Sequence, residues 1–94
     1  MLGFITRIEL HNNATFQDYE NLHRNMNLSG FSKSIVADNG LSYLLPTAEY
    51  FSKIGTLESN LESAKNAAGR IGKPYAVFIA QMSGWSSVGL SLGK

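Results

Sequence analysis

The chain has 94 residues, of which 44% are hydrophobic and 16% are charged, with eight basic residues against seven acidic ones. This composition excludes a disordered chain, because enough apolar surface is present to offset the entropy of ordering, and the near balance of charge argues against a strongly electrostatic nucleic-acid binder. The lack of cysteine excludes disulfides and zinc-thiolate sites, and it fits a reducing compartment.

No segment of the sequence has the pattern of a leader or a membrane span. The opening MLGFITRIEL is too short for the apolar core of a signal peptide, and Arg7 and Glu9 interrupt it. A membrane helix needs roughly 20 apolar residues, and no run approaches that length. We therefore expect a cytoplasmic protein with no membrane partner. Because no repeat or linker is found, residues 1–94 are expected to form a single domain.

The first predicted element is a strand over residues 3–10, GFITRIEL. Alternate residues form an apolar side and a mostly polar side, namely Phe4, Thr6, Ile8 and Leu10 against Ile5, Arg7, Glu9 and the following His11. A period of two with one polar side is typical of a strand whose second face meets water. The turn formers of HNNA then end the strand.

The next segment predicts a helix that begins at Phe16 and ends before Gly30. Thr15 and Asp18 have the spacing of a capping box, with an aspartate where glutamate is usual. Residues three and four apart form one apolar stripe, which contains Phe16, Tyr19, Leu22, His23 and Met26. Gly30 suits the left-handed position that ends such a helix.

Residues 31–45 predict a β-hairpin. The alternation over residues 31–37 and the apolar run over residues 41–45 give its two strands. Asn39-Gly40 between them is the preferred pair for a type I′ turn, because both residues tolerate positive φ. Asp38 is expected to bond the backbone of the turn. Pro46 cannot donate to a ladder, so it is expected to end the second strand.

Residues 47–55 carry no readable pattern, and a second helix is predicted after them. Thr56 can cap this helix, and Gly72 and Pro74 end it. Its apolar positions recur at steps of four and three, at Leu57, Leu61, Ala64, Ala68 and Ile71. A strong strand over residues 75–80, a turn at SGW and a weaker strand over residues 87–92 follow.

The order of these elements is strand, helix, strand, strand, helix, strand. It predicts the α+β class and a ferredoxin-like βαββαβ fold, in which an antiparallel sheet carries two helices on one face. The weaker strand at the end adds a short C-terminal extension. Such a fold leaves the other face of the sheet open, and function in it commonly lies on that face or in the loops.

The open face is therefore the first place to look for chemistry. Arg7, Glu9 and His11 would stand in a row there, at steps of about 7 Å given a rise of roughly 3.3 Å per residue. Arg7 could bind a phosphate, and His11 or Glu9 could move a proton. The alternative is an ordinary strand face with solvated charges, and spacing alone favours that alternative.

Other residues offer weaker signals. His23 is either a packing residue of the helix stripe or a catalytic group, and its neighbour Arg24 is expected to face solvent. The aromatic residues Tyr43, Tyr50, Tyr75 and Trp85 would stack on unpaired bases if they were exposed. No P-loop, GxGxxG or HExxH pattern is present, and no metal-ligand set is expected.

Four stretches of the chain resemble a known family. They are the first strand ITRIEL, the helix DYENLHRNM, the long run GFSKSIVADNGLSYLLPTAEY and the helix end AAGRIGKPY. Together they are similar to the GhoS family of endoribonuclease antitoxins from type V toxin-antitoxin systems. The resemblance covers most of the chain and rests on the order of these strings, because none of them is a catalytic signature.

The resemblance implies a ferredoxin-like fold and cleavage of the messenger RNA of a small membrane-active toxin. It implies that a basic residue of the first helix takes part in RNA cleavage, and His23 or Arg24 lies at that position. It also implies an acidic residue at the end of the first strand, where Glu9 is the nearest match. We expect transesterification with His11 or His23 as base or acid and Arg7 or Arg24 on the phosphate. Lys33 joins the RNA-binding set, and cofactor use stays open.

A second reading belongs to a different class of function. The chain would then be a non-catalytic ferredoxin-like module that binds a partner protein or forms a homodimer through its open sheet face. The charge of +1 and the lack of a catalytic cluster favour this reading, whereas the string resemblance favours the endoribonuclease. RNA is the partner in the first reading, and neither reading involves DNA.

Overall fold

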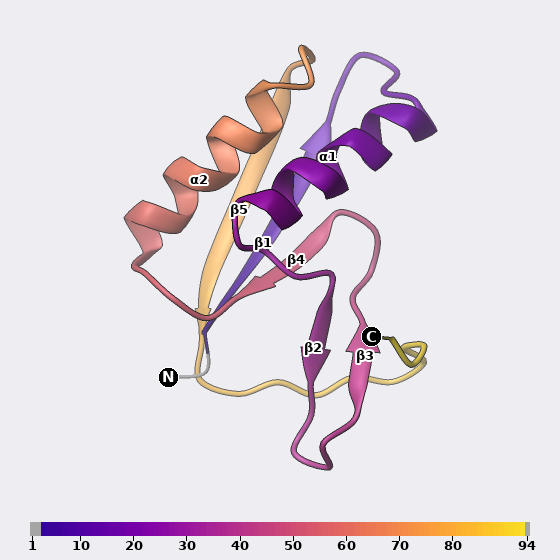
Figure 1. The fold of residues 1–94 in the computed structure, drawn as a ribbon, viewed down its shortest axis with the longest axis vertical. Coiled ribbons are helices and arrows are strands. Elements are labelled where there is room, and N and C mark those ends of the chain that lie inside the picture. The colour runs from indigo at the N-terminus through magenta and orange to yellow at the C-terminus, as the bar shows by residue number, and fades with distance from the viewer. Residues whose placement is uncertain (1–2, 94) are drawn as a thin grey trace.

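The elements follow the chain in the order β1 (Gly3–Leu10), α1 (Phe16–Leu28), β2 (Ser34–Val36), β3 (Ser42–Leu44), β4 (Glu49–Ser52), α2 (Leu57–Gly69) and β5 (Tyr75–Met82). This computed structural model describes residues 3–93 (Figure 1). The predicted α+β class is confirmed, since helices and antiparallel strands share one core.

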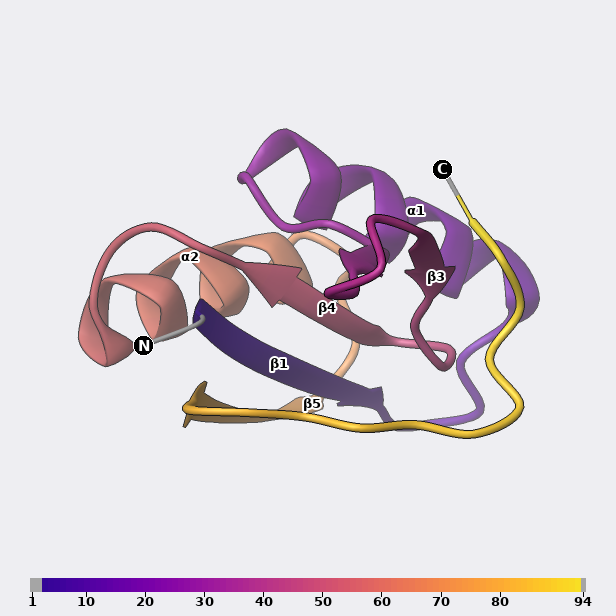
Figure 2. The same cartoon turned by 90° about the horizontal axis from the view of Figure 1, so that it is seen from below.

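The main sheet has the order β4-β1-β5, and β1 runs antiparallel to both neighbours. Strands β4 and β5 therefore run parallel to each other, and α2 connects them across β1. This is a split β-α-β unit. Both helices cover one face of the sheet (Figure 2), where the core contains Leu22 and Met26 of α1 with Ala64, Ala67 and Ala68 of α2.

The predicted ferredoxin-like order is not formed cleanly. Strands β2 and β3 pair with each other and form a hairpin outside the main sheet, below it in Figure 1. Their place beside β1 is taken by β4, which lies in residues 47–55, the stretch without a readable pattern. After one bridge between Ser32 and Phe51 the chain leaves the edge of β4. The alternation of residues 31–37 indicated extended backbone but could not identify its partner strand.

The turn of the hairpin also differs from the prediction. Gly40 has a φ of 83°, whereas Asn39 has no positive φ, so the type I′ assignment is wrong. The Gly40 N–H donates to the Ala37 carbonyl at 2.9 Å, and the Ala37 N–H donates to Leu41 at 2.9 Å. This is a three-residue loop with glycine in the left-handed position. The side chain that bonds the turn is Asn39, which accepts from the Leu41 N–H at 2.9 Å.

The helix starts are confirmed, and the apolar stripes are confirmed in part. Thr15 and Asp18 form the predicted capping box, and Thr56 and Ser59 form a second one. Phe16, however, is 79% exposed, because the first turn of α1 projects beyond the sheet. In α2 the buried set includes Asn60, whose amide is satisfied by the Ser52 hydroxyl and two backbone carbonyls.

The predicted C-terminal strand over residues 87–92 shrinks to one bridge, between Leu92 and Tyr43. Leu44 N–H donates to the Ser91 carbonyl at 2.8 Å, and Gly93 N–H donates to Ser42 at 2.9 Å. The chain end therefore extends the hairpin at the edge of β3 and adds nothing to the main sheet.

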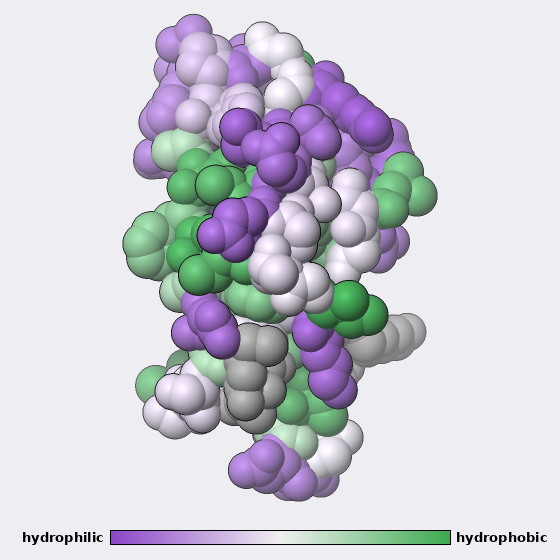
Figure 3. All heavy atoms as spheres, turned by 90° about the vertical axis from the view of Figure 1, so that its left-hand side faces the viewer, coloured by the Kyte–Doolittle hydropathy of each residue, from purple (hydrophilic) through white to green (hydrophobic). Residues whose placement is uncertain are grey.

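Figure 3 shows the molecule from the left-hand side of Figure 1, the side on which α2 lies. Apolar side chains gather there in a band between polar ones.

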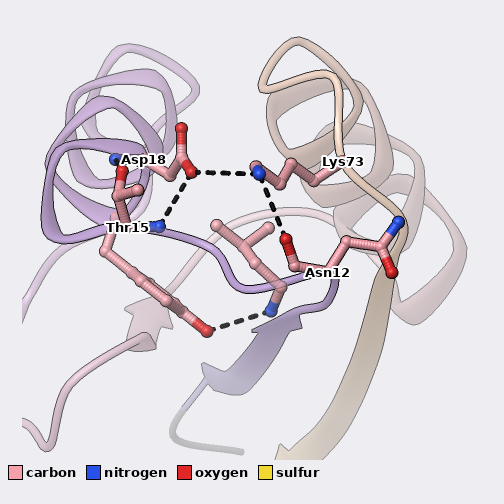
Figure 4. Close-up of polar contacts among 6 residues, drawn as sticks. Asn12, Thr15, Asp18 and Lys73 are labelled. Carbon is pink, nitrogen blue, oxygen red and sulfur yellow. Dashed lines mark hydrogen bonds and ion pairs between the residues drawn. The ribbon is translucent and has the colours of Figure 1, made fainter.

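One polar cluster fastens the loops at the far end of the sheet (Figure 4). Lys73 donates to the Asn12 carbonyl at 3.2 Å and lies 3.8 Å from the Asp18 carboxylate. Asp18 in turn accepts from the Thr15 N–H at 2.9 Å, and these bonds hold the pKa of Asp18 below its usual value. The loop before β5 is thereby tied to the start of α1.

Candidate functional site

The alternation of β1 places its side chains on two faces, as the sequence predicted. The residues Phe4, Thr6, Ile8 and Leu10 are buried under the helices. Arg7 and Glu9 are exposed on the open face, where Arg7 lies opposite Glu49 on one side and Phe78 on the other. His11 follows the strand and is exposed, and its backbone N–H donates to the Pro74 carbonyl at 2.8 Å.

His23 lies on the helix-covered side and has a specific partner there. Strand β4 pairs Tyr50 with Thr6, which turns the Tyr50 ring toward α1 and buries it completely. The Tyr50 hydroxyl lies 2.6 Å from His23 Nδ1, and the two ring centroids are 5.7 Å apart. This contact joins residues that are 27 positions apart in the sequence, and it fixes the orientation of the imidazole.

The surroundings of His23 favour its neutral form. Burial lowers the pKa of His23 from its ordinary value, the charge of Lys33 lowers it further, and Glu20 opposes both effects. Burial also raises the pKa of the Tyr50 hydroxyl far above its ordinary range. Tyr50 therefore keeps its proton. Its oxygen can accept from the Nδ1–H of the neutral ring, which leaves Nε2 unprotonated and able to take up a proton.

Lys33 is held firmly beside this pair. Its ammonium donates to the backbone carbonyls of Leu45, Pro46 and Glu49 at 3.3, 2.7 and 3.4 Å. It also lies 5.3 Å from the centroid of the Tyr50 ring, within the range of a cation–π interaction. Burial lowers the pKa of Lys33, while Glu49 raises it. A fixed cation thus stands next to the fixed histidine.

An open hollow of about 520 Å³ borders these groups. We call it the α1 hollow. Its walls come from α1 and from the segment that follows the helix, and they include Glu20, His23, Arg24, Asn27 and Lys33. Arg24 is exposed, and one of its guanidinium nitrogens lies 3.4 Å from the Asn21 side chain. The hollow therefore combines a neutral imidazole with two cations at a surface that solvent can reach.

The sheet divides the six residues that the sequence proposed. His23, Arg24 and Lys33 share the α1 hollow, whereas Arg7 and Glu9 line a different hollow of about 490 Å³ with Phe78. His11 lines neither of them. It lies five residues beyond Thr6, the partner of Tyr50, which is about 17 Å along an extended strand. Arg7 and His23 therefore line separate hollows.

Tyr50 is the functional residue whose role sequence reasoning missed. The sequence suggested it as a stacking platform if exposed, but complete burial rules out that use. Its actual role follows from β4, where burial alternates along Glu49, Tyr50, Phe51 and Ser52. Those four residues after Pro46 carried the only signal, and four residues are too few to establish a strand by period. The aromatic residues Tyr43, Tyr75 and Trp85 are half-buried.

Two features are absent from residues 3–93. In that part of the chain no group of three or more histidine, aspartate or glutamate side chains is arranged to hold a metal ion. No helix there combines the length and the apolar character needed to cross a membrane. No family model, curated protein or solved structure matches the chain. The resemblance to GhoS antitoxins stays a prediction.

Proposed function

We propose that this protein is a small endoribonuclease and that the α1 hollow holds the phosphodiester it cleaves. The observation that carries the proposal is the fixed His23. A buried tyrosine hydroxyl orients its imidazole at 2.6 Å, and its surroundings keep it neutral beside two cations at an open surface. Proton transfer by a positioned histidine whose pKa lies near the working pH is effective general base catalysis.

In the proposed reaction His23 Nε2 takes the proton of a ribose 2′-hydroxyl. The resulting oxygen attacks the adjacent phosphorus, and the bond from phosphorus to the 5′-oxygen of the next nucleotide breaks. The leaving 5′-oxygen takes its proton from solvent water, which reaches the open hollow. The products are a 2′,3′-cyclic phosphate and a free 5′-hydroxyl. Because the 2′-hydroxyl is the nucleophile, DNA is not a substrate.

Arg24 and Lys33 stabilise the phosphate in this scheme, since negative charge builds up on it as the reaction proceeds. Cations already fixed near that charge stabilise the transition state without reorganising. The three carbonyl bonds of Lys33 provide such fixation. Arg24 is less constrained, and its planar guanidinium suits two oxygens of one phosphate. The proposed assignments are therefore His23 as base, Lys33 as the fixed cation beside the phosphate and Arg24 as phosphate ligand.

The cellular role in the proposal is that of an antitoxin of a type V system, which cleaves the messenger RNA of a membrane-active toxin. This part rests on the resemblance to the GhoS family. The split β-α-β unit of β4, α2 and β5 around β1 is compatible with kinship to ferredoxin-like nucleases, and such kinship belongs to the same proposal. A short gene for a membrane peptide next to this one would support it.

The test compares His23→Ala with His11→Ala on single-stranded RNA that carries the toxin message. We expect His23→Ala to lower the cleavage rate by roughly 100- to 10,000-fold, the usual contribution of a general base. His11→Ala should cut at the wild-type rate, because His11 lies outside the α1 hollow. Equal rates for His23→Ala and the wild-type protein would refute the assignment, and so would products that carry a 5′-phosphate.

The open sheet face favours a second candidate, the non-catalytic homodimer. Phe78 is 69% exposed there, beside the half-buried Ile5 and Phe51. Arg7 and Glu9 on the same face could meet their opposite charges on a second copy related by a two-fold axis. Light scattering over a range of concentrations tests this candidate. A dimer that Phe78→Asp converts to a monomer would support it, and a monomeric wild-type protein at all concentrations would exclude it.

A further inference from the structure

The α1 hollow is the first of a series that continues along residues 31–38. A second hollow, of about 410 Å³, shares Ser32 and Ser34 with it and reaches Trp85. A third, of about 620 Å³, shares Asp38 and Trp85 with the second and includes Tyr43. Each hollow thus borders the next, and together they lead from His23 to the turn after β5.

We propose that this series of hollows is an extended binding path for single-stranded RNA, with Trp85 as a stacking platform for a base at its far end. The inference rests on the proposed function, because it takes the RNA cleaved at His23 as the occupant. It adds a subsite that lies away from the reacting groups. Its consequence is a preference for substrates long enough to reach both ends of the path.

The composition of the path matches the parts of a single strand of RNA. Arg24 and Lys33 line the first hollow and Lys53 lines the second, so the phosphates meet cations along the way. The third hollow offers two half-buried aromatic rings, those of Trp85 and Tyr43. Cations that follow the backbone together with aromatic rings that take the bases are the usual means of binding single-stranded nucleic acid.

Carboxylates also line the path, and their positions are consistent with this use. Glu20 borders the first hollow, and Asp38 lies between the second and the third. Three cations therefore face two carboxylates over the whole path. Asp38 and the neighbouring Asn39 lie beside the aromatic rings, where a carboxylate can accept from the amino group of a base. Asn39 is 3.4 Å from the Tyr43 hydroxyl, which holds the two side chains together.

The open sheet face is the competing surface for RNA, and its charges argue against it. Phe78 is exposed there, but Glu9 and Glu49 accompany the single cation Arg7 among the paired positions of that face. Two carboxylates around one arginine repel a phosphate chain more than they attract it. The path beginning at His23 has the opposite balance, so it is the better site for RNA.

The length of the path sets the size of the substrate. Residues 32–38 span at most about 20 Å, given a strand rise of roughly 3.3 Å per residue. A stacked single strand that rises about 3.4 Å per nucleotide covers this distance with about six nucleotides. We therefore expect a dinucleotide bound at His23 to end short of Trp85 and an octamer to reach it.

The fluorescence of Trp85 gives a direct test, because it is the only tryptophan in the chain. The probes are 2′-O-methyl RNA oligomers of two, four and eight nucleotides, which lack the nucleophile and so bind without being cut. We expect the octamer at saturation to quench the fluorescence and the dinucleotide to leave it unchanged. Equal quenching by both lengths, or none by a bound octamer, would overturn the inference.

Variants separate this inference from the proposed function. Trp85→Ala should weaken octamer binding roughly 5- to 100-fold, the usual range for one stacked base. It should cleave a dinucleotide substrate at the wild-type rate. Trp85→Phe, which keeps an aromatic ring, should recover most of the affinity. Phe78→Ala is the matched control on the open sheet face and should bind normally. Normal binding by Trp85→Ala, or a loss confined to Phe78→Ala, would refute the path while leaving cleavage at His23 to stand or fall on its own assay.

Discussion

The two faces of the main sheet differ in how they use the same strand. On the helix-covered face the residues of β1 are buried, and Tyr50 of the neighbouring strand reaches through the core to hold His23. On the open face Arg7 and Glu9 project into solvent from between those buried positions. His23 is both fixed and lowered in pKa because it borders a packed core. Arg7 and Glu9 on the open face have no packed core around their charges.

The largest expected difference between the faces concerns stability. Leu22→Ala removes a fully buried side chain of α1, and the cavity left behind should lower the free energy of unfolding by about 2–5 kcal/mol. Phe78→Ala on the open face should change it by less than about 0.5 kcal/mol, because little packing is lost at an exposed site. Urea denaturation of both variants measures this. Similar losses would mean that the open face is covered in solution.

A smaller effect is expected when only the hydroxyl of Tyr50 is removed. Tyr50→Phe keeps the ring and its packing but leaves His23 Nδ1 without its partner at 2.6 Å. The loss of stability should be about 0.5–1.5 kcal/mol. Tyr50 is a positioning residue in the proposed mechanism, so the acidic limb of the pH profile of cleavage should shift as well. A lower rate with an unchanged pH profile would indicate a purely structural role.

Thr6→Val is a substitution on the buried face that should raise the free energy of unfolding, whereas the preceding variants should lower it. The hydroxyl of Thr6 has no hydrogen-bond partner within the described part of the chain, and Thr6 is fully buried opposite Tyr50. Because an unsatisfied buried hydroxyl costs about 1–3 kcal/mol, its replacement by a methyl group should raise the free energy of unfolding by about 1 kcal/mol. Thermal and urea denaturation would reveal the gain. A loss of stability would show that the hydroxyl has a partner in solution.

The smallest effect expected is a pH dependence. The folded state lowers the pKa of His23 below its ordinary value of 6.5, so the unfolded chain binds the proton first as the pH falls. Stability from this residue is therefore complete above pH 6.5 and declines toward the folded pKa. His23→Gln should lose less stability than the wild-type protein between pH 7 and pH 5. Parallel curves for the two proteins would contradict the burial of His23.

The sequence predicted local structure more reliably than partners. Both helix starts and the alternation of β1 followed from short-range patterns, because caps and strand faces depend on neighbouring residues. The separate hairpin and β4 depended on which strand pairs with which, and no local period contains that information. Phe16 fits the helical stripe of α1 yet is exposed. The periodicity of a helix does not show how far the sheet beneath it extends, so it could not predict this exposure.

In the candidate site, too, the single residues could be predicted from the sequence but their grouping could not. His23, Arg24 and Lys33 could be proposed from the sequence, but their grouping depends on the register of β4 against β1, which places Tyr50 opposite Thr6. A shift of that register by one residue would turn the ring to the open face. The sequence proposed Arg7 and His11 alongside Arg24 and His23. It does not show which face of the sheet the first helix covers, so it could not separate the two pairs.

The pairing of β1 with β5 has a consequence for how the protein folds. Gly3 lies opposite Met82 and Leu10 lies opposite Tyr75, so almost the whole chain separates the two strands. A ladder between strands so far apart in the sequence gives a high contact order, and closing so long a loop slows folding. Strand β1 cannot form its ladder with β5 until β5 has left the ribosome. The main sheet is therefore expected to be completed only after β5 has been synthesised.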